Sequence, residues 1–424
     1  MRVLHVSQRY WPAVGGAEAY LAEISQRLVL SGHQVTIATT DALDIELFWN
    51  SKRRRVACSE EEHRGVRILR FPVRHLPLVD ITYPALRRLL WLGSRSRVVP
   101  LTLHHRFARF TPWVPALWQW LRATRDQFDV VAATTICFET LVEAGLWFAR
   151  RHGVPFVVHP LTHLGAGASP GEDNLSRFYT MRHQVALSRA SNAVVAMTPS
   201  EQHFYLNKGV SQERLVVIGP GVNPADVLGG DGARFRSRHG LTAPIVACLS
   251  TLTYDKGSMH LVEAMRRLWL SGREVHLVLA GATLESFRQY LAVLPEDDRH
   301  RLHVLGPIED SEKRDLLAAA DIFVMPSRTD SFGIVYLEAW LYGKPVIGAR
   351  TWGVCDVIRD GVDGILVPFG ATDELAESIS HLLDIPERSK AMGRAGREKV
   401  LEQFTWDHQY PPVHELYQSL AAKR

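Results

Sequence analysis

Two carboxylates stand eight positions apart in the second half of the chain, Asp330 and Glu338, on either side of Gly333. An apolar run ending at Met325 predicts a strand, and a helix is expected to begin near Gly333 after a polar loop. The first N–H groups of a helix lack partners and lie at the positive end of its dipole, so they can bind a phosphate. Because glycine has no Cβ, Gly333 would let a diphosphate approach the backbone closely.

Glu338 lies on a helix that is apolar nearly all round. Its neighbours there are Ile334, Val335, Leu337, Trp340 and Leu341. A carboxylate buried in such a helix is costly unless something pairs with it. The two hydroxyls of a ribose would supply donors, and the structural alternative is a core salt bridge with an arginine. The helix alone favours neither interpretation.

This segment resembles the family 4 retaining glycosyltransferases (glycosyl transferases group 1), which have the GT-B fold. Their pattern is two acids eight positions apart, flanking Phe-Gly and followed by Ala, with Pro-Ser before and Gly-Lys-Pro-Val after, as in 326–346 here. Asp330 stands where glutamate is more usual. The resemblance implies that Asp330 lies near the donor sugar and that Glu338 binds the ribose. It also implies that the amides of Gly333, Ile334 and Val335 hold the donor diphosphate, and that Ser331 and Phe332 are among the donor-binding residues.

Lys256 follows the first expected strand of the second half, in Tyr254-Asp255-Lys256-Gly257. The resemblance implies that Lys256 faces the diphosphate, where a point charge offsets the charge that develops on the leaving group. The family often has an arginine a few positions earlier. This chain has Ser250-Thr251-Leu252 there, so Thr251 is expected to donate at most one neutral hydrogen bond to the donor. The alternative is an ordinary surface lysine in a turn.

A glycine pair follows the first strand of the chain, in Val14-Gly15-Gly16-Ala17-Glu18. The resemblance implies that the amides of Gly15 and Gly16 face the donor phosphate or the attacking acceptor, and a strand, a glycine loop and a helix start suit that role. An ordinary tight turn is the alternative. The segment is not GxGxxG, which disfavours a nicotinamide cofactor.

His163 follows the expected strand at 155–158. The resemblance implies that its imidazole points into the cleft near the sugar and its leaving phosphate, where it could donate a hydrogen bond or stabilise charge. His159 is a second candidate, expected to pack at the strand end. The chain contains neither Asp-x-Asp nor cysteine and histidine at metal-binding spacing. No metal and no cofactor is therefore expected besides a nucleotide diphosphate sugar as co-substrate.

The elements that must position these residues alternate short apolar strands with amphipathic helices, which is typical of α/β layers. Strands of a first sheet are expected at 2–7, 34–39, 66–71, 129–133, 155–158, 193–197 and 215–218. After the Pro- and Gly-rich segment 219–224, a second set is expected at 245–250, 276–280, 303–305, 322–325, 345–348 and 365–367. These patterns predict an α/β protein with two doubly wound, Rossmann-like domains whose ligands bind at the carboxyl ends of the strands.

The resemblance implies that the two domains face each other across a central cleft. The predicted domains are an N-terminal acceptor-binding domain at 1–222 and a C-terminal nucleotide-sugar-binding domain at 223–405. Residues 406–424 are expected to form a helix that returns to the first domain, because 404–407 and Tyr417 resemble the last helix of the family.

A basic, tryptophan-bearing insert occupies about 41–125. Between Lys52 and Arg125, 16 Lys and Arg face four acids, although the whole chain has a net charge of only +4. Arginines beside Trp91, Trp113, Trp118 and Trp120 suit an anionic membrane surface. The alternatives are a buried aromatic core with a solvated charged face, or nucleic acid, for which no recognition module is visible. No nucleic-acid partner is expected.

Together these observations predict a glycosyltransferase of the EC 2.4 type that moves a sugar with retention to a hydroxyl acceptor, a lipid-linked or polysaccharide precursor. No run approaches ~18 uncharged apolar residues, and the N-terminus lacks the features of a signal peptide. A cytoplasmic enzyme, peripheral on the inner face of the membrane, is expected. Two alternatives are a non-catalytic GT-B binding subunit, suggested by Thr251 and Asp330, and another sugar-nucleotide enzyme such as an epimerase or a phosphorylase.

Overall fold

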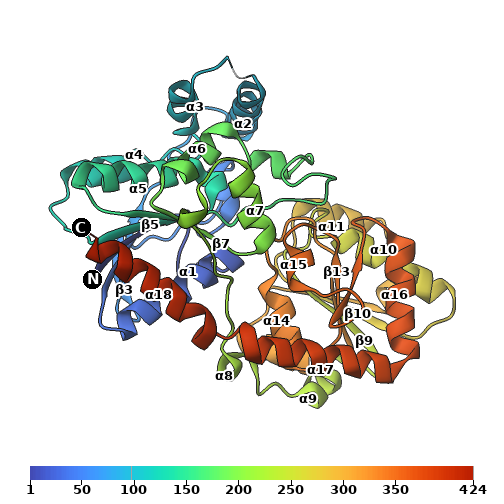
Figure 1. Cartoon of the computed structure of the whole chain (residues 1–424). Coiled ribbons are helices and arrows are strands. Elements are labelled where there is room, and N and C mark those ends of the chain that lie inside the picture. The colour runs from blue at the N-terminus through green and yellow to red at the C-terminus, as the bar shows by residue number, and fades with distance from the viewer. Residues whose placement is uncertain (97, 424) are drawn as a thin grey trace. The chain divides into compact units, whose positions relative to one another are not determined.

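The computed structural model describes residues 1–96 and 98–423, which form two compact units (Figure 1). The N-terminal unit comprises Met1–His163, Gly171–Gly219 and Tyr410–Arg424, and the C-terminal unit comprises Leu164–Pro170 and Pro220–Gln409. The chain thus passes between the units at the start of the breaker-rich segment 219–224. Within the described residues, none of the helices combines the length and the apolar character needed to cross a bilayer.

An eight-stranded sheet forms the centre of the N-terminal unit, in the order β3-β4-β2-β1-β5-β6-β7-β8. The strands are β1 (Arg2–Val6), β2 (Gln34–Thr40), β3 (Glu60–His63), β4 (Val66–Phe71), β5 (Val130–Thr134), β6 (Phe156–His159), β7 (Ala193–Ala196) and β8 (Leu215–Val217). All seven strands expected from the sequence are present. The additional strand β3 is antiparallel and lies at the edge of the sheet. Its sequence, Glu-Glu-Glu-His, has none of the apolar pattern that marks a buried strand, so the sequence did not predict it.

The C-terminal unit is built on a six-stranded parallel sheet in the order β11-β10-β9-β12-β13-β14. Its strands are β9 (Ile245–Leu249), β10 (His276–Ala280), β11 (Leu302–Gly306), β12 (Ile322–Met325), β13 (Val346–Ala349) and β14 (Gly364–Val367). They coincide with the six predicted strands to within a few residues. The chain order reverses between the neighbours β9 and β12, and this is the switch point at which α/β sheets bind ligands. The loops after these two strands carry Lys256 and Asp330.

Helices flank both sheets, which explains why the central strands are buried along their whole length. The helices of the N-terminal unit are α1 (Gly16–Leu30), α2 (Val79–Arg95), α3 (Leu101–Ala108), α4 (Pro115–Ala123), α5 (Glu139–His152), α6 (Arg182–Ala190) and α7 (Pro199–Asn207), with the short 3-10 turns η1 (Ile45–Phe48), η2 (Ile136–Phe138), η3 (Ser176–Phe178) and η4 (Gln212–Arg214). Those of the C-terminal unit are α8 (Pro224–Val227), α9 (Gly232–His239), α10 (Ser258–Leu270), α11 (Glu285–Ala292), α12 (Glu296–Arg299), α13 (Asp310–Ala319), α14 (Ile334–Leu341), α15 (Val354–Val357), α16 (Thr372–Asp384) and α17 (Pro386–Gln403). The last helix is α18 (Trp406–Ala422).

The end of α18 is anchored in the N-terminal unit by Tyr417, which is completely buried. Its hydroxyl lies 3.0 Å from Nε2 of His159 and 3.3 Å from Nε2 of His5. The other ring nitrogens of these histidines contact the hydroxyls of Tyr20 and Ser25, each at 2.9 Å. His159 therefore packs at its strand end, as expected, and it belongs to a buried network that attaches the last helix to the sheet.

We expect Tyr417→Phe to lower the free energy of unfolding by about 1–3 kcal/mol, because the change leaves two buried imidazole nitrogens without their partner. Tyr410→Phe is the matched control on the same helix. Its hydroxyl contacts Ser31 Oγ at 2.7 Å and donates to the carbonyl of Arg27 at 3.0 Å, both where water can replace it, so its loss should cost about 1 kcal/mol or less. Urea denaturation followed by tryptophan fluorescence measures both variants. Equal losses would contradict the anchoring role of Tyr417.

The same network makes the stability of the N-terminal unit depend on pH. Burial lowers the pKa of His5 and of His159 from 6.5 to about 3. Below pH 6.5 the unfolded chain binds protons at these imidazoles, whereas the folded chain does not bind them until the pH approaches 3. We therefore expect the free energy of unfolding to be largest above pH 6.5 and to fall as the pH decreases toward 3. Urea denaturation across this range measures the effect, and a flat profile would contradict it.

Candidate active site

The helix predicted to bind phosphate is present in the C-terminal unit. Strand β12 ends at Met325, and α14 begins after Gly333, which has a φ of +88°. A Cβ at Gly333 would lie 2.5 Å from the ring of Tyr336, so both the backbone and the packing require glycine. The hydroxyl of Tyr336 donates to the carbonyl of Met325 at 2.6 Å and fixes the helix to the end of the strand. The first-turn amides, with those of Ile334 and Val335 among them, have no acceptor within the helix itself.

Glu338 is buried on this helix with 9% of its surface exposed. Its Oε1 accepts a hydrogen bond from Nζ of Lys313 on α13 at 3.0 Å. Its Oε2 is also buried and has no hydrogen-bond partner among the described residues. The structural alternative was a pairing with an arginine, and none of the arginines that the structure describes pairs with Glu338. One oxygen of the carboxylate pairs with a partly exposed lysine, and the other can accept a hydrogen bond from a ligand.

Lys256 and Asp330 lie side by side although 74 positions separate them. Nζ of Lys256 is 3.0 Å from both carboxylate oxygens of Asp330. The turn that carries Lys256 packs tightly on the loop after β12, since a Cβ at Gly257 would lie 2.2 Å from the carbonyl oxygen of Pro326. The ion pair therefore follows from the adjacency of β9 and β12. It places a positive charge and a carboxylate at the carboxyl ends of these two strands.

The other predicted residues of the C-terminal unit differ in what they can offer a ligand. Thr251 is exposed just after β9, and Ser331 is half-buried. The side chain of Phe332 is buried, with its ring centroid 5.5 Å from that of Phe404. Phe332 can therefore contribute only its backbone to a site.

Arg328, two residues before Asp330, is a further charged residue of this region that was not predicted from the sequence. Its guanidinium donates to Oδ1 of Asp255 at 2.6 and 2.9 Å. It also lies 4.9 Å from the ring centroid of Phe369 and 5.5 Å from that of Tyr254. The Arg328–Asp255 contact is a second ion pair between the Lys256 turn and the loop after β12. Two ion pairs therefore hold these two loops together. Arg328 lies within the segment 326–346, but its pairing with Asp255 depends on the fold and cannot be seen in the sequence.

In the N-terminal unit, Gly15 and Gly16 form the start of α1, after β1. A Cβ at Gly15 would lie 2.2 Å from Oε2 of Glu18, whereas a Cβ at Gly16 would meet nothing within 4 Å. Glu18 accepts from Nε of Arg9 at 2.9 Å and from Nε2 of Gln8 at 3.2 Å. This buried ion pair, which was not predicted from the sequence, lies against the glycine loop, and the absence of a Cβ at Gly15 leaves room for the Glu18 carboxylate.

Gly15→Ala and Gly16→Ala form a matched pair of tests. Gly15→Ala should force the end of the Glu18 side chain to shift, and we expect it to lower the free energy of unfolding by about 1–3 kcal/mol. Gly16→Ala should change it by less than about 1 kcal/mol, because the new methyl group meets no atom. If Gly16 faces a substrate, Gly16→Ala lowers activity while the melting temperature is retained. Unchanged activity in that variant would argue against a role for Gly16.

His163 lies in the turn after β6 and is partly exposed. The turn is constrained, because Leu161 has a φ of +51°. The buried carboxylate of Glu201 accepts a hydrogen bond from the amide of Thr162 at 2.6 Å, and burial raises its pKa. The ring of His163 lies against that of Tyr179, with a centroid distance of 4.5 Å. Glu201 and Tyr179 thus position a histidine that the sequence identified only by its place after a strand.

The predicted residues are divided between the two units. Gly15, Gly16 and His163 belong to the N-terminal unit, and the others belong to the C-terminal unit. Within the C-terminal unit the structure brings Lys256 and Asp330 together beside the loop that leads into α14. No group of three or more metal-ligating side chains occurs in residues 1–96 and 98–423.

Both halves of the chain match known protein families. Residues 15–221 match the glycosyl transferase 4-like domain, and residues 231–399 match the glycosyl transferases group 1. D-inositol 3-phosphate glycosyltransferase 1 of Catenulispora acidiphila is 30% identical over 419 residues, which cover 96% of this chain and 91% of that protein. The GDP-mannose-dependent monoacylated alpha-(1-6)-phosphatidylinositol monomannoside mannosyltransferase of Corynebacterium glutamicum is 35% identical over 173 residues, or 39% of this chain. That match spans about half of the mannosyltransferase, 45% of its length.

Solved structures share the fold over nearly the whole chain. The structure of Anabaena HepE in complex with UDP and glucose is similar with a TM-score of 0.71 over 98% of this chain and 99% of that one, at 19% sequence identity. At so low an identity the likeness concerns the fold alone. The two parallel-sheet units are those of the GT-B fold.

Proposed function

Because the chain belongs to the family 4 glycosyltransferases (glycosyl transferases group 1), we propose that it transfers a sugar from a nucleotide diphosphate sugar to a hydroxyl acceptor. The observation that carries this proposal is Glu338, a buried carboxylate with one oxygen paired and the other available. It lies one turn into a helix whose N-terminus can bind a diphosphate. A nucleoside diphosphate offers both complements, ribose hydroxyls and phosphates.

The proposed roles follow from the chemistry of each group. Glu338 accepts hydrogen bonds from the ribose, and Lys256 with the amides at Gly333, Ile334 and Val335 stabilises the departing diphosphate. Asp330 orients the sugar, and its ion pair also orients the side chain of Lys256. His163 assists near the leaving phosphate, and the glycine loop admits the acceptor.

The reaction proposed is a front-face displacement with retention. The bond between the anomeric carbon and the diphosphate oxygen breaks, and the acceptor oxygen bonds to the same face of the sugar. The acceptor proton passes to the departing diphosphate. This mechanism assigns no covalent nucleophile to the protein.

The acceptor proposed is a lipid-linked or polysaccharide precursor, and the site of action is the cytoplasmic face of a membrane. The Corynebacterium glutamicum relative is named for transfer to a phosphatidylinositol mannoside, and the insert of this chain is strongly basic. Both observations support an anionic membrane surface as the place where the acceptor is met.

We also propose that no metal ion takes part, since Lys256 and the helix N-terminus would supply the positive charge at the diphosphate. Transfer should therefore be unchanged when the assay contains EDTA in place of Mg²⁺. A loss of activity that added Mg²⁺ restores would overturn this part of the proposal.

The experiment that tests the function is a thermal-shift screen against nucleotide diphosphate sugars. A donor at ~100 times its Kd should stabilise the protein by about 2.7 kcal/mol. Release of free nucleoside diphosphate together with a glycosylated product then excludes an epimerase.

A non-catalytic binding subunit is the second candidate, and two departures from the family pattern favour it, Thr251 and Asp330. It predicts donor binding without turnover, and it also predicts that Asp330→Asn leaves the function of the protein unchanged. If no donor stabilises the protein, both candidates fail.

A further inference from the structure

The helices α2 and α3 carry an apolar face that is exposed to solvent. On α2 and its N-cap the exposed apolar residues follow helical spacing, at Leu78, Ile81, Ala85, Leu89 and Leu92. Leu78, Ile81 and Leu89 expose 72%, 67% and 63% of their surface. Val98 on the connection to α3, and Leu103 and Phe107 on α3, are exposed apolar residues as well. Single exposed apolar side chains are common, but a continuous helical stripe marks an interaction surface.

The charge around this α2–α3 face is predominantly positive. Residues 74–109 contain seven arginines and a single acidic residue, Asp80. Arg88, Arg95 and Arg106 are exposed on the two helices. Apolar side chains flanked by arginines are typical of a helix that lies in the interface of a membrane with anionic lipid.

Of the tryptophans of the insert, only Trp91 lies on α2, where it is half-buried with the guanidinium of Arg177 4.2 Å from its ring centroid. Trp118 is buried on α4, 5.8 Å from Trp147 and 4.3 Å from the guanidinium of Arg109. Trp120 lies 5.6 Å from Phe71. The expectation that these rings meet lipid headgroups is therefore wrong for Trp118, which is part of the core. Apart from Phe107, the exposed apolar residues of the α2–α3 face are aliphatic, and they lie on α2, on α3 and on the connection between them.

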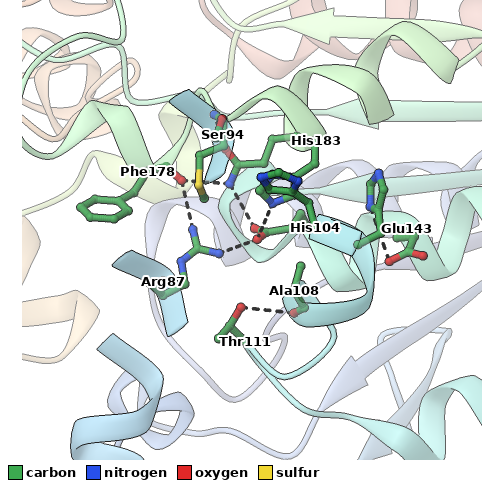
Figure 2. Close-up of polar contacts among 12 residues, drawn as sticks. Arg87, Ser94, His104, Ala108, Thr111, Glu143, Phe178 and His183 are labelled. Atoms are coloured by element: carbon green, nitrogen blue, oxygen red, sulfur yellow. Dashed lines mark hydrogen bonds and ion pairs between the residues drawn. The ribbon is translucent and has the colours of Figure 1, made fainter. Parts of the chain in front are cut away.

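The opposite side of α2 is fastened by a buried polar network (Figure 2). Nη1 of Arg87 donates to Oε1 of Glu139, the first residue of α5, at 2.5 Å, and Nη2 donates to the carbonyl of Phe178 at 3.1 Å. His183 and Gln184 of α6 bond the same carboxylate at 3.0 Å. Burial opposes the charge of Glu139, but Arg87 and His183 outweigh it and lower the pKa of Glu139 to about 2. These bonds fix the orientation of α2 so that its apolar stripe faces outward, and Figure 1 shows α2 and α3 standing out from the rest of the N-terminal unit.

We propose that the α2–α3 face docks on an anionic lipid surface, with the aliphatic stripe in the headgroup boundary and the arginines against lipid phosphates. A second copy of this chain fits less well, because a two-fold contact would place the arginine-rich patch against itself. A nucleic acid also fits less well, because its phosphates would match the arginines but nothing in its backbone would match the aliphatic stripe. The inference builds on the membrane contact of the proposed function, but not on donor binding or transfer.

Sedimentation with vesicles tests the proposal. We expect the full chain to pellet with vesicles of phosphatidylglycerol and phosphatidylcholine at a 3:7 ratio, and to stay in solution with phosphatidylcholine alone. Ile81→Ser/Leu89→Ser/Leu92→Ser should weaken binding at least about tenfold. The matched control is Leu30→Ser/Val217→Ser, which removes exposed apolar residues elsewhere in the N-terminal unit and should bind like the parent.

A second pair of variants tests the charges. Arg88→Glu/Arg95→Glu should also reduce binding about tenfold or more, whereas Arg150→Glu/Arg151→Glu, exposed at the end of α5, should reduce it much less. Donor-induced thermal shifts should stay the same in all four variants, so a failure of docking is distinguishable from a failure of the proposed function. Vesicle binding that the α2 variants leave intact would overturn the proposal. So would a dimer in solution that the triple variant converts to a monomer.

Discussion

Glu338→Gln is expected to lower kcat/KM for the donor by about 100-fold, mainly through a weaker apparent affinity. A hydrogen bond to a charged acceptor contributes about 1.5–3 kcal/mol when it is buried, and the neutral amide offers one acceptor in place of a carboxylate. The substitution preserves shape, so the packing of α14 is retained. Initial rates at varied donor concentration, with binding measured by calorimetry, give the size of the effect.

Lys313→Met is the control that separates donor binding from internal pairing. It removes the ammonium group that donates to Glu338 at 3.0 Å and leaves the carboxylate itself in place. If Glu338 serves the donor, Lys313→Met affects kcat/KM far less than Glu338→Gln. If Glu338 serves only the ion pair, the two substitutions lower stability alike and neither changes donor affinity. The second outcome would refute the proposed role.

Lys256→Met is expected to lower kcat by about 10²–10³-fold, because it removes a positive charge placed where the leaving diphosphate develops charge. The donor should still bind through the helix N-terminus and Glu338, so the loss concerns kcat more than donor affinity. Single-turnover measurements with saturating donor isolate this effect. Methionine preserves the length of the side chain, which limits changes in packing.

Two further variants make the test of Lys256 specific. Lys390→Met, at a lysine with 64% of its side chain exposed on α17, should leave kcat unchanged. Asp330→Asn retains Lys256 but removes the negative charge that pairs with it. The variant therefore shows whether Lys256 needs its ion pair with Asp330 to stabilise the leaving diphosphate. Full activity of Lys256→Met would mean that the helix N-terminus alone stabilises the leaving group.

Much of the fold could be predicted because strand and helix patterns are local. All thirteen expected strands are present, since parallel strands buried on both faces are continuous apolar runs that a reader of the sequence can recognise. The edge strand β3 was missed because a polar, half-exposed strand has no such run. The start of α14 at Gly333 was predicted by the same local logic, from a strand, a polar loop and a glycine before an apolar helix.

The candidate site could be predicted as a set of residues but not as a set of contacts. Lys256 and Asp330 were chosen separately, and their ion pair exists because β9 and β12 are neighbours in the sheet. Arg328 lay within the motif without any sign of Asp255 as its partner. Arg9 was not predicted as part of the site, although it lies against the glycine loop through its ion pair with Glu18.

The amino-acid sequence is enough to predict most of the strands and helices, the positions of the glycine-rich turns, and the family that the chain resembles. These properties depend on the spacing of residue types along the chain, and the amino-acid sequence gives that spacing completely. Tertiary structure alone decided that Glu338 pairs with Lys313 through one oxygen, and that the insert buries Trp118 while it exposes Ile81 and Leu89. Such outcomes depend on which face of a helix meets which neighbour, and that choice is made by packing between segments far apart in the chain.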